Sequence, residues 1–330
     1  MKPTDLRTAL RPYRGRPVYL EAVAGNNGDD LIMRGAERAL DRLELERVDT
    51  PDRAELILIN GSFKSDFWPM AIEQIRSHSE RFPDTPLVVL PSTYLFKPGA
   101  FEAAFAGRRA PAHLFCRERY SLRHLQGKKF PVEVRLGLDD DMAFWLRGSG
   151  WIKRLRERAR ERHLLVVERA DHERSTAGTD SQPASVSGSL ASTVYRRTPA
   201  ALTQPVVNLI ERHRARRRPL TPFARAARKM VEHEYPDKVS LPVLAADIAR
   251  RRYTNFDGYA RLIAESGVVF TSRMHVGVLG GLLGKPTYLV QGSHYKIVGV
   301  YEQSLDELPN VTLVDRECRV IEPALEGTPA

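Results

Sequence analysis

The sequence is poor in cysteine and in long apolar runs, and each shortage excludes a class of protein. It has 2 cysteines among 330 residues, too few for the disulfide framework that holds small secreted domains together. No apolar run approaches the roughly 20 residues that a membrane-spanning helix needs. The first residues also lack the apolar core of a signal peptide. We therefore expect a cytoplasmic protein, either soluble or bound peripherally to the inner face of the membrane.

Several catalytic and binding signatures are missing as well. The first glycine-rich turn, Gly25 to Asp29, lacks the G-x-G-x-x-G spacing of dinucleotide-binding proteins. The sequence contains no Walker A, G-x-S-x-G or protein-kinase signature. The histidines are scattered and the cysteines unpaired, so we predict no metal site. The basic segments lack interleaved aromatic residues and a helix-turn-helix or zinc-finger pattern, so we predict no nucleic-acid partner.

Positive charge, by contrast, is abundant. The chain has 51 lysines and arginines against 41 acidic residues, a net charge of +10, which implies an anionic partner such as a nucleotide, a phosphorylated substrate or a lipid surface. The strongly basic segments are residues 153–162 and 212–218. Glu157 and Glu161 interleave with the first, which favours a solvated helix face. A patch for anionic lipid is the alternative.

The chain is long enough for two domains of about 150 residues each. Predicted strands alternate with predicted helices in both halves, which favours doubly wound parallel sheets. We place the domain boundary near residues 147–150, giving domains of residues 1–148 and 149–330. The predicted strands are residues 16–23, 45–48, 54–60, 86–90, 113–116, 132–136, 163–168, 239–242, 268–271 and 287–290. The predicted helices are residues 31–43, 70–79, 150–162, 205–217, 223–234, 256–266 and 276–283, and a further helix begins at residues 117–121. Residues 174–205 are predicted to form a loop or irregular insertion, and the secondary structure of residues 240–247 is ambiguous.

The most informative segment follows the predicted strand 268–271. Arg273 and His275 stand where that strand ends and a helix begins. Open α/β sheets place ligands at this edge, and a helix N-terminus favours an anion. A guanidinium beside an imidazole therefore suggests binding of a charged small molecule with proton transfer, although such residues can also be ordinary surface residues. Lys296 adds a second cation to the same rim, and the glycines of the helix, at 277, 280 and 281, suggest that something approaches its backbone closely.

Two other strand ends carry candidate ligand-binding residues. Arg169 follows the strand 163–168 at the same sheet edge as Arg273. Two arginines converging on one anion fit bidentate recognition of phosphate or carboxylate, while charges after a buried strand also commonly face solvent. At the first turn, Asp29 can cap the following helix or act as a base toward a hydroxyl. The small residues Gly25, Asn26, Asn27 and Gly28 allow backbone amides to reach a ligand.

Together these segments resemble the polysaccharide pyruvyl transferase family. The family's G-N-x-G-D turn is similar to Gly25–Asp29, and its S-R-x-H motif is similar to Ser272–His275. A G-K-P and a later lysine correspond to Gly284–Pro286 and Lys296. Weaker similarities cover residues 117–121 (RERYS), 138–144 (LDDDMAF) and 169–173 (RADHE). The sequence departs from the family where Asn60-Gly61-Ser62 replaces a glycine triplet and where Leu138-Asp139 replaces a proline, and residues 176–203 match no family segment.

The resemblance implies two Rossmann-like domains arranged as in GT-B glycosyltransferases, with the active site in the interdomain cleft. The donor would be phosphoenolpyruvate and the acceptor a sugar of a polysaccharide or lipid-linked glycan, giving a cyclic pyruvate ketal and phosphate. No cofactor or metal is implied. The resemblance implies that Arg273, Arg169, Lys296 and Met274 bind the donor and that His275 is the general acid. It also implies that Asp29 and the loop 25–28 face the acceptor.

Two other functions remain open from the sequence. A glycosyltransferase of the same architecture would use a nucleotide sugar, and the basic cleft expected between the domains would suit it. A non-catalytic protein that binds anions or lipid would instead use the basic helices. We expect phosphoenolpyruvate and a sugar acceptor as the partners, with peripheral contact to an anionic membrane as a further expectation.

Overall fold

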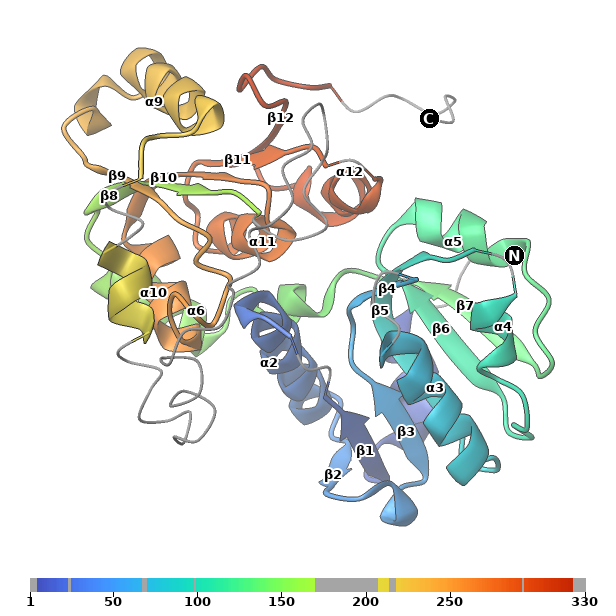
Figure 1. Cartoon of the computed structure of the whole chain (residues 1–330). Coiled ribbons are helices and arrows are strands. Elements are labelled where there is room, and N and C mark those ends of the chain that lie inside the picture. Colours follow the sequence, from blue (N-terminus) through green and yellow to red (C-terminus); the bar gives the residue numbers. More distant parts are fainter. Residues whose placement is uncertain are drawn as a thin grey trace, which may run out of the picture.

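The computed structural model describes residues 5–22, 25–66, 70–97, 99–169, 207–213, 218–292 and 294–322. Its strands form two parallel sheets with helices packed against them (Figure 1). The first sheet is built from elements coloured blue to green, and the second from elements coloured lime to red. The predicted α/β class is therefore confirmed.

The first sheet has seven strands in the order β2-β1-β3-β5-β6-β7, and β4 pairs with β5. Every pairing is parallel. The central strand β3 is buried at all four positions, as expected for a parallel strand covered on both faces. The elements are β1 (Pro17–Glu21), β2 (Glu46–Val48), β3 (Leu56–Ile59), β4 (Phe63–Ser65), β5 (Leu87–Leu95), β6 (Ala112–Cys116) and β7 (Val134–Leu138), with helices α1 (Leu6–Leu10), α2 (Asn27–Arg42), α3 (Met70–Arg81), α4 (Ala100–Ala103) and α5 (Arg119–Gln126).

The second sheet has five parallel strands in the order β12-β11-β10-β8-β9. Its central strand β10 is buried along its whole length. The elements are β8 (His163–Val167), β9 (Val243–Ala245), β10 (Ser266–Thr271), β11 (Thr287–Val290) and β12 (Val311–Val314), with helices α6 (Gly150–Arg158), α9 (Pro222–Glu234), α10 (Phe256–Ala264), α11 (Met274–Leu282) and α12 (Lys296–Val300). Residues 207–213 are also helical.

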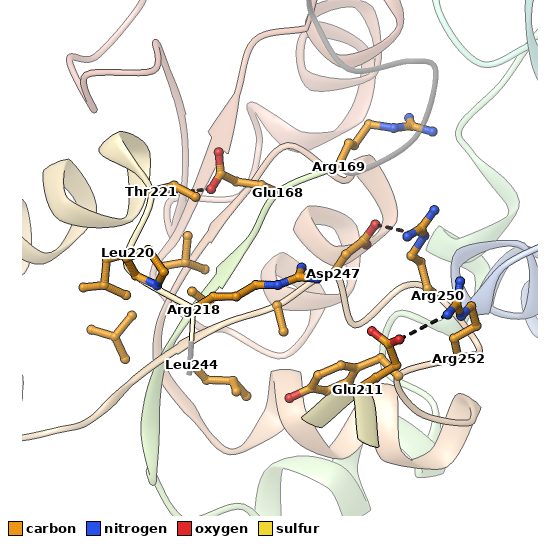
Figure 2. A pocket seen from close by; sticks show the side chains of 16 residues that line it. Glu168, Arg169, Glu211, Arg218, Leu220, Thr221, Leu244, Asp247, Arg250 and Arg252 are labelled. Carbon is orange, nitrogen blue, oxygen red and sulfur yellow. Dashed lines mark hydrogen bonds and ion pairs between the residues drawn. The ribbon is translucent and has the colours of Figure 1, made fainter. Parts of the chain in front are cut away.

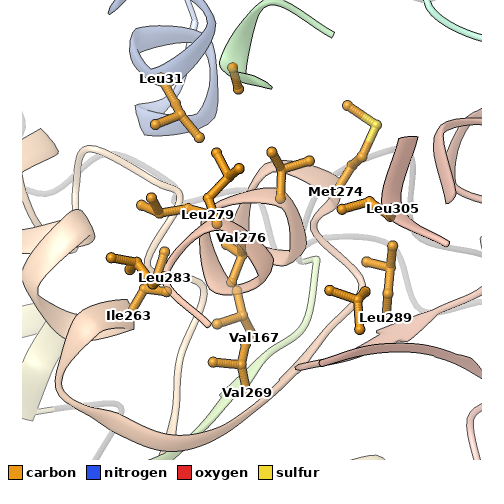
Figure 3. Close-up of a cluster of buried hydrophobic side chains, with 14 of the residues drawn as sticks. Leu31, Val167, Ile263, Val269, Met274, Val276, Leu279, Leu283, Leu289 and Leu305 are labelled. Carbon is orange, nitrogen blue, oxygen red and sulfur yellow. The ribbon is translucent and has the colours of Figure 1, made fainter. Parts of the chain in front are cut away.

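One apolar cluster joins elements of both halves of the chain. Leu31 of α2 packs into the core that α11 forms with β8 and β10 (Figure 3). Ala143 and Leu146, from the 3₁₀ turn Met142–Leu146, belong to the same cluster. The first sheet ends at Leu138 and the second begins at His163, so the predicted boundary near 147–150 falls between the sheets. The division into two domains stays a prediction.

The structure corrects several predicted elements. Strand β5 does not stop before Pro91 but runs to Leu95; its register against β6 shifts between Val89 and Ser92, and such an irregularity accommodates a proline inside a strand. The predicted strand 239–242 is wrong, because Pro236–Lys238 forms a 3₁₀ turn and the strand begins at Val243. The basic helix predicted for 150–162 ends at Arg158. Strands β4 and β12 were not predicted, and the predicted insertion 174–205 lies outside the described residues.

Candidate active site

The S-R-x-H segment forms the corner between β10 and α11, as predicted. Arg273 is the N-cap residue of α11, and its backbone N–H donates to Thr271 Oγ1 at 2.9 Å. The close approach expected at the helix glycines is confirmed, and the structure names the neighbour. A Cβ at Gly277 would lie 2.8 Å from Leu289, and one at Gly280 would lie 2.5 Å from Thr287 Oγ1. These glycines let α11 pack tightly on the sheet, so what approaches the helix backbone is β11 and not a ligand.

The structure brings His275 against the first glycine-rich turn. A Cβ at Gly28 would lie 3.0 Å from both Cβ and Nδ1 of His275, so a glycine is needed at this close approach. The imidazole side chain is 15% exposed, and its other nitrogen, Nε2, lies 3.3 Å from Asp141 Oδ2. His275 therefore sits between the turn that follows β1 and a carboxylate that follows β7.

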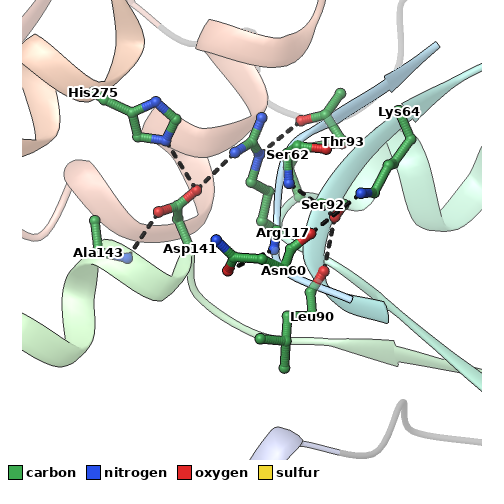
Figure 4. A network of polar contacts seen from close by, with 12 residues as sticks. Asn60, Ser62, Lys64, Leu90, Ser92, Thr93, Arg117, Asp141, Ala143 and His275 are labelled. Atoms are coloured by element: carbon green, nitrogen blue, oxygen red, sulfur yellow. Dashed lines mark hydrogen bonds and ion pairs between the residues drawn. The ribbon is translucent and has the colours of Figure 1, made fainter. Parts of the chain in front are cut away.

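Asp141 is the centre of a buried polar network (Figure 4). Its Oδ2 accepts from Arg117 Nη1 at 2.7 Å, and its Oδ1 accepts from the Ala143 backbone N–H at 2.9 Å. Arg117 also donates to Thr93 Oγ1 at 2.9 Å. Burial alone would raise the pKa of Asp141, but His275 and Arg117 outweigh it and hold the pKa well below its usual range. Asp141 is therefore an ionised carboxylate inside the protein.

Lys64 lies in the same network and is completely buried. Its Nζ donates to the Asn60 carbonyl at 3.2 Å, and no carboxylate in the part of the chain that the structure describes forms an ion pair with it. Burial, with a smaller contribution from the Arg117 charge, lowers the pKa of Lys64 to about 7. The hydroxyl of the neighbouring Ser62 is buried without a hydrogen-bond partner. This edge of the sheet therefore holds an excess of buried positive charge.

Sequence reasoning missed both Asp141 and Lys64. The signal for Asp141 was available, because it follows strand β7 at the carboxyl edge of the sheet and belongs to the segment that resembles the family pattern. Lys64 gave no such signal. It lies in the three-residue strand β4, just after the point where the predicted strand 54–60 was expected to break.

Arg273 and Arg169 lie on adjacent strand ends, as predicted. The Arg169 backbone N–H donates to Ser272 Oγ at 3.0 Å. The Arg273 guanidinium donates through Nε to Asp247 Oδ1 at 3.0 Å and through Nη2 to Asp247 Oδ2. Arg273 is only 6% exposed. The predicted roles of both arginines in donor binding stay predictions, and the structure adds Asp247 as the residue that orients Arg273.

Arg169 and Asp247 also line a cavity of about 290 Å³ at the carboxyl ends of β8 and β9 (Figure 2). Apolar side chains, including those of Leu220 and Leu244, contribute to its wall. Its charged lining consists of four arginines and three carboxylates: Arg169, Arg218, Arg250, Arg252, Glu168, Glu211 and Asp247. The cavity is therefore suited to a small ligand that carries negative charge.

Lys296 and Met274 occupy less open positions than the sequence suggested. Lys296 begins α12, is 5% exposed, and places its Nζ 4.5 Å from the centroid of the Phe63 ring. The Met274 side chain packs in the apolar cluster of Figure 3. Their predicted contacts with the donor stay predictions.

The first turn is organised by helix capping. Asp29 Oδ2 accepts from the Asn26 backbone N–H at 2.7 Å, and Asn26 Oδ1 accepts from the Gly28 N–H at 2.8 Å. A Cβ at Gly25 would collide with the Asp29 carboxylate. Asn27 Nδ2 donates to the carbonyls of Ile248 and Thr254 at 3.1 and 3.0 Å and so ties the turn to the second half of the chain. The capping role of Asp29 is confirmed, and its role as a base stays a prediction.

Within the described ranges, no group of three or more His, Cys, Asp and Glu residues could hold a metal ion. None of the helices in the described part of the chain is both long enough and apolar enough to span a bilayer.

Comparisons with known proteins agree with the motif evidence. No curated protein matches the sequence. A functionally uncharacterized protein, KP1_0663 from Klebsiella pneumoniae subsp. pneumoniae NTUH-K2044, has a similar structure, with a TM-score of 0.58 and 16% sequence identity over 93% of this chain and 96% of that chain. This likeness supports the fold alone. The family model for polysaccharide pyruvyl transferase matches residues 26–294, which is most of the sequence and includes Asp29, Lys64, Arg117, Asp141, Arg169, Asp247, Arg273 and His275. The chain therefore belongs to the polysaccharide pyruvyl transferase family.

Proposed function

We propose that this protein transfers the pyruvyl group of phosphoenolpyruvate to a sugar of a polysaccharide or lipid-linked glycan, forms a cyclic pyruvate ketal and releases phosphate. The observation that carries the proposal is the placement of His275. Its imidazole lies between a glycine-rich turn and an ionised buried carboxylate, at the N-terminus of a buried helix. A proton donor at an anion-favouring helix end suits an anionic substrate that must be protonated.

The donor needs several positive groups, because phosphoenolpyruvate carries both a phosphate and a carboxylate. Arg169, Arg273 and Lys296 are the candidates, and the arginine-lined cavity lies directly beside the first two. Arginine pairs with planar carboxylate and with phosphate through two parallel hydrogen bonds. Asp247 fixes the plane of the Arg273 guanidinium, which limits the orientations that a bound anion can take.

The reaction begins with protonation of the donor. His275 delivers a proton to C3 of phosphoenolpyruvate, and the electron pair of the C2=C3 bond forms the new C–H bond. C2 becomes electrophilic, and a sugar hydroxyl forms an O–C2 bond as it loses its proton. The C2–O bond to phosphate then breaks, with the electron pair leaving on phosphate. A second sugar hydroxyl then adds to C2, loses its proton and closes the ketal. The two sugar hydroxyls release two protons in all. One replaces the proton that His275 placed on C3, and the other leaves with phosphate.

The acceptor is expected beside the turn 25–29. Asp29 Oδ1 accepts no hydrogen bond from any described residue, whereas Oδ2 holds the cap. Oδ1 can therefore accept a hydrogen bond from a sugar hydroxyl while Oδ2 keeps its capping hydrogen bond at the start of α2. This arrangement supports Asp29 as the group that orients or deprotonates the acceptor, at the same site where His275 acts on the donor.

The proposal is tested by phosphate release. We expect the wild-type protein to release phosphate from phosphoenolpyruvate only when an acceptor glycan is present, and His275→Ala to lose at least about a hundredfold in rate, since general acid catalysis contributes roughly 10²–10⁴. Unchanged turnover in His275→Ala would remove His275 as the acid. Thermal stabilisation by uridine diphosphate but not by phosphoenolpyruvate would contradict the choice of donor.

A further inference from the structure

The contact between Asp141 and His275 adds a polar link to the apolar packing between the 3₁₀ turn 142–146 and α11. Asp141 precedes the 3₁₀ turn after β7, and His275 lies in the first turn of α11. We propose that Asp141 is the positioning residue for His275, that it holds Nε2 of the ring and so directs Nδ1 toward the turn 25–29, and that Arg117 fixes Asp141 in place. The inference takes the general-acid role of His275 from the proposed function.

The orientation of Asp141 is fixed before any substrate binds. Its two oxygens take hydrogen bonds from Ala143 N–H and Arg117 Nη1 at 2.9 and 2.7 Å. Arg117 is held in turn by Thr93 Oγ1. Both side chains of the ion pair are almost completely buried, at 1% and 0% exposed. A carboxylate held in this way accepts from the His275 ring in a single geometry, as the orienting group of a catalytic histidine must.

The other ring nitrogen then has a defined direction. The Gly28 Cβ position lies 3.0 Å from Nδ1, so Nδ1 faces the turn that carries Asp29. With Nε2 occupied by Asp141, the proton that leaves for the substrate is the one on Nδ1. The pair therefore places the acidic proton between the donor side and the acceptor side of the site.

The charged groups around His275 point to Asp141 as the dominant one. Asp141 and Arg117 approach from the first sheet, Asp29 lies across the turn of α2, and on the remaining side Arg273 is neutralised by Asp247. Among the ion pairs of the described residues, His275 has Asp141 as its carboxylate partner. An ionised carboxylate in contact with an imidazole stabilises the protonated ring. Asp141 is therefore the charged group that can act on the ring directly.

The chain offers a matched control in the next residue. Asp140 is a half-buried carboxylate, but it accepts from Ser304 Oγ at 2.7 Å and makes no contact with His275. Asp141→Asn and Asp140→Asn remove the same charge from adjacent positions. Since Asp141→Asn leaves Arg117 buried without its carboxylate, the double variant Asp141→Asn/Arg117→Gln removes both charges and provides the test if the single variant does not fold.

The decisive measurement is the ¹⁵N spectrum of the His275 ring in the full-length protein with labelled histidine, the signals being assigned with His275→Ala. We expect the ring nitrogen signals to move in Asp141→Asn and in the double variant, because Nε2 loses its carboxylate partner, and to keep their wild-type positions in Asp140→Asn. Equal signals in all four proteins would overturn the proposal, as would an equal change in Asp140→Asn.

Turnover gives a second and separate readout. If phosphoenolpyruvate is the donor, Asp141→Asn should lower kcat at least tenfold with KM for phosphoenolpyruvate changed less than threefold. A rise in KM with kcat unchanged would contradict a positioning role. If the wild-type protein releases no phosphate with any acceptor, the proposed function fails, while the ¹⁵N spectrum of the His275 ring still decides whether Asp141 positions His275.

Discussion

The two sheets place opposite kinds of charge chemistry at their carboxyl edges. At the edge of the seven-stranded sheet, Lys64, Arg117 and Asp141 are each no more than 1% exposed and bonded to fixed partners. At the edge of the five-stranded sheet, the charged groups surround a cavity, and the side chains of Arg250 and Arg252 are 43% and 63% exposed. The first edge is organised in advance, whereas at the second edge the Arg273–Asp247 pair is fixed and the outer arginines are open to a ligand.

This contrast separates two tasks that an enzyme must perform. Groups that orient an acid need a single geometry, and burial with full hydrogen bonding provides it. Groups that bind a multiply charged substrate need to reach solvent, because the anion arrives hydrated and must exchange water for arginine. Substitutions at the first edge should therefore change stability and reactivity, while substitutions at the second should change affinity.

The largest effect is expected from breaking the buried ion pair. Arg117→Met leaves Asp141 buried without its arginine, and loss of one partner of a buried pair costs about 3–5 kcal/mol. Arg14→Met is the control, because Arg14 forms a bidentate pair with Glu44 in which the side chains are 66% and 61% exposed, and exposed pairs contribute about 0–1 kcal/mol. Urea unfolding measures the loss of unfolding free energy in both variants. Equal losses would show that burial does not make the Arg117–Asp141 pair more important for stability than the Arg14–Glu44 pair.

Lys64→Met should stabilise the protein in a pH-dependent way. Because the pKa of Lys64 is lowered to about 7 in the folded protein, the unfolded chain binds one proton more between about pH 7 and its ordinary value near 10.5. The loss of the Lys64 proton in the folded protein therefore makes the wild type more stable as the pH rises from about 7 to about 10.5. Below about pH 7 Lys64 is charged in both states, and the folded protein bears the full free-energy cost of the buried charge. The variant lacks this dependence.

The measurement is the difference in unfolding free energy between Lys64→Met and the wild type. We expect the variant's advantage to shrink by about 3 kcal/mol from pH 7 to pH 9.5, at about 1.4 kcal/mol per pH unit. Taking the difference cancels the titration of other groups, such as Cys318, whose pKa burial raises to about 12. A constant advantage would mean that Lys64 keeps its proton in the folded state throughout the window.

The parts of the site that a local pattern marks could be predicted from the sequence, and the network that distant segments assemble could not. The corner with Arg273 and His275 follows a run of β-branched and aromatic residues and precedes a helix, so local pattern alone places it. The turn 25–29 is recognisable in the same way. Both signals are contained within about ten consecutive residues, which is the range over which periodicity and turn chemistry act.

The buried network depends on contacts between distant segments. Lys64 lies in a three-residue strand without an apolar pattern, and its burial follows from strands that pair only in the folded chain. Asp247, which holds Arg273, lies in the segment whose secondary structure was ambiguous. The helix glycines indicated a close approach, but the sequence could not name β11 as the neighbour, because that packing is a tertiary contact. Burial and pairing of charges are thus set by the fold and not by local sequence.

A smaller effect is expected where the two edges meet. Gly28→Ala places a methyl group 3.0 Å from Cβ and Nδ1 of His275, so the ring must shift, and we expect turnover to fall about 10- to 100-fold. The methyl group would also lie 2.9 Å from Asn26 Oδ1, which caps the helix, so the gain of about 1 kcal/mol that alanine brings to a helix should be offset and the unfolding free energy should change little or fall. Gly127→Ala is the control, since nothing lies within 4 Å of its Cβ position. Equal activity in both variants would show that His275 tolerates displacement.

The smallest effect is expected at the open edge. Arg250→Ala removes one arginine of the cavity, and we expect the dissociation constant for phosphoenolpyruvate to rise about five- to tenfold, with unfolding free energy changed by less than about 0.5 kcal/mol. Arg228→Ala, on α9 and paired with Glu232, is a control outside the cavity. The difference in affinity for phosphoenolpyruvate between Arg250→Ala and the wild type should shrink as salt is added, because salt screens exposed charges. Salt-independent loss, or a loss of stability instead of affinity, would place Arg250 with the buried groups and remove the distinction between the two edges.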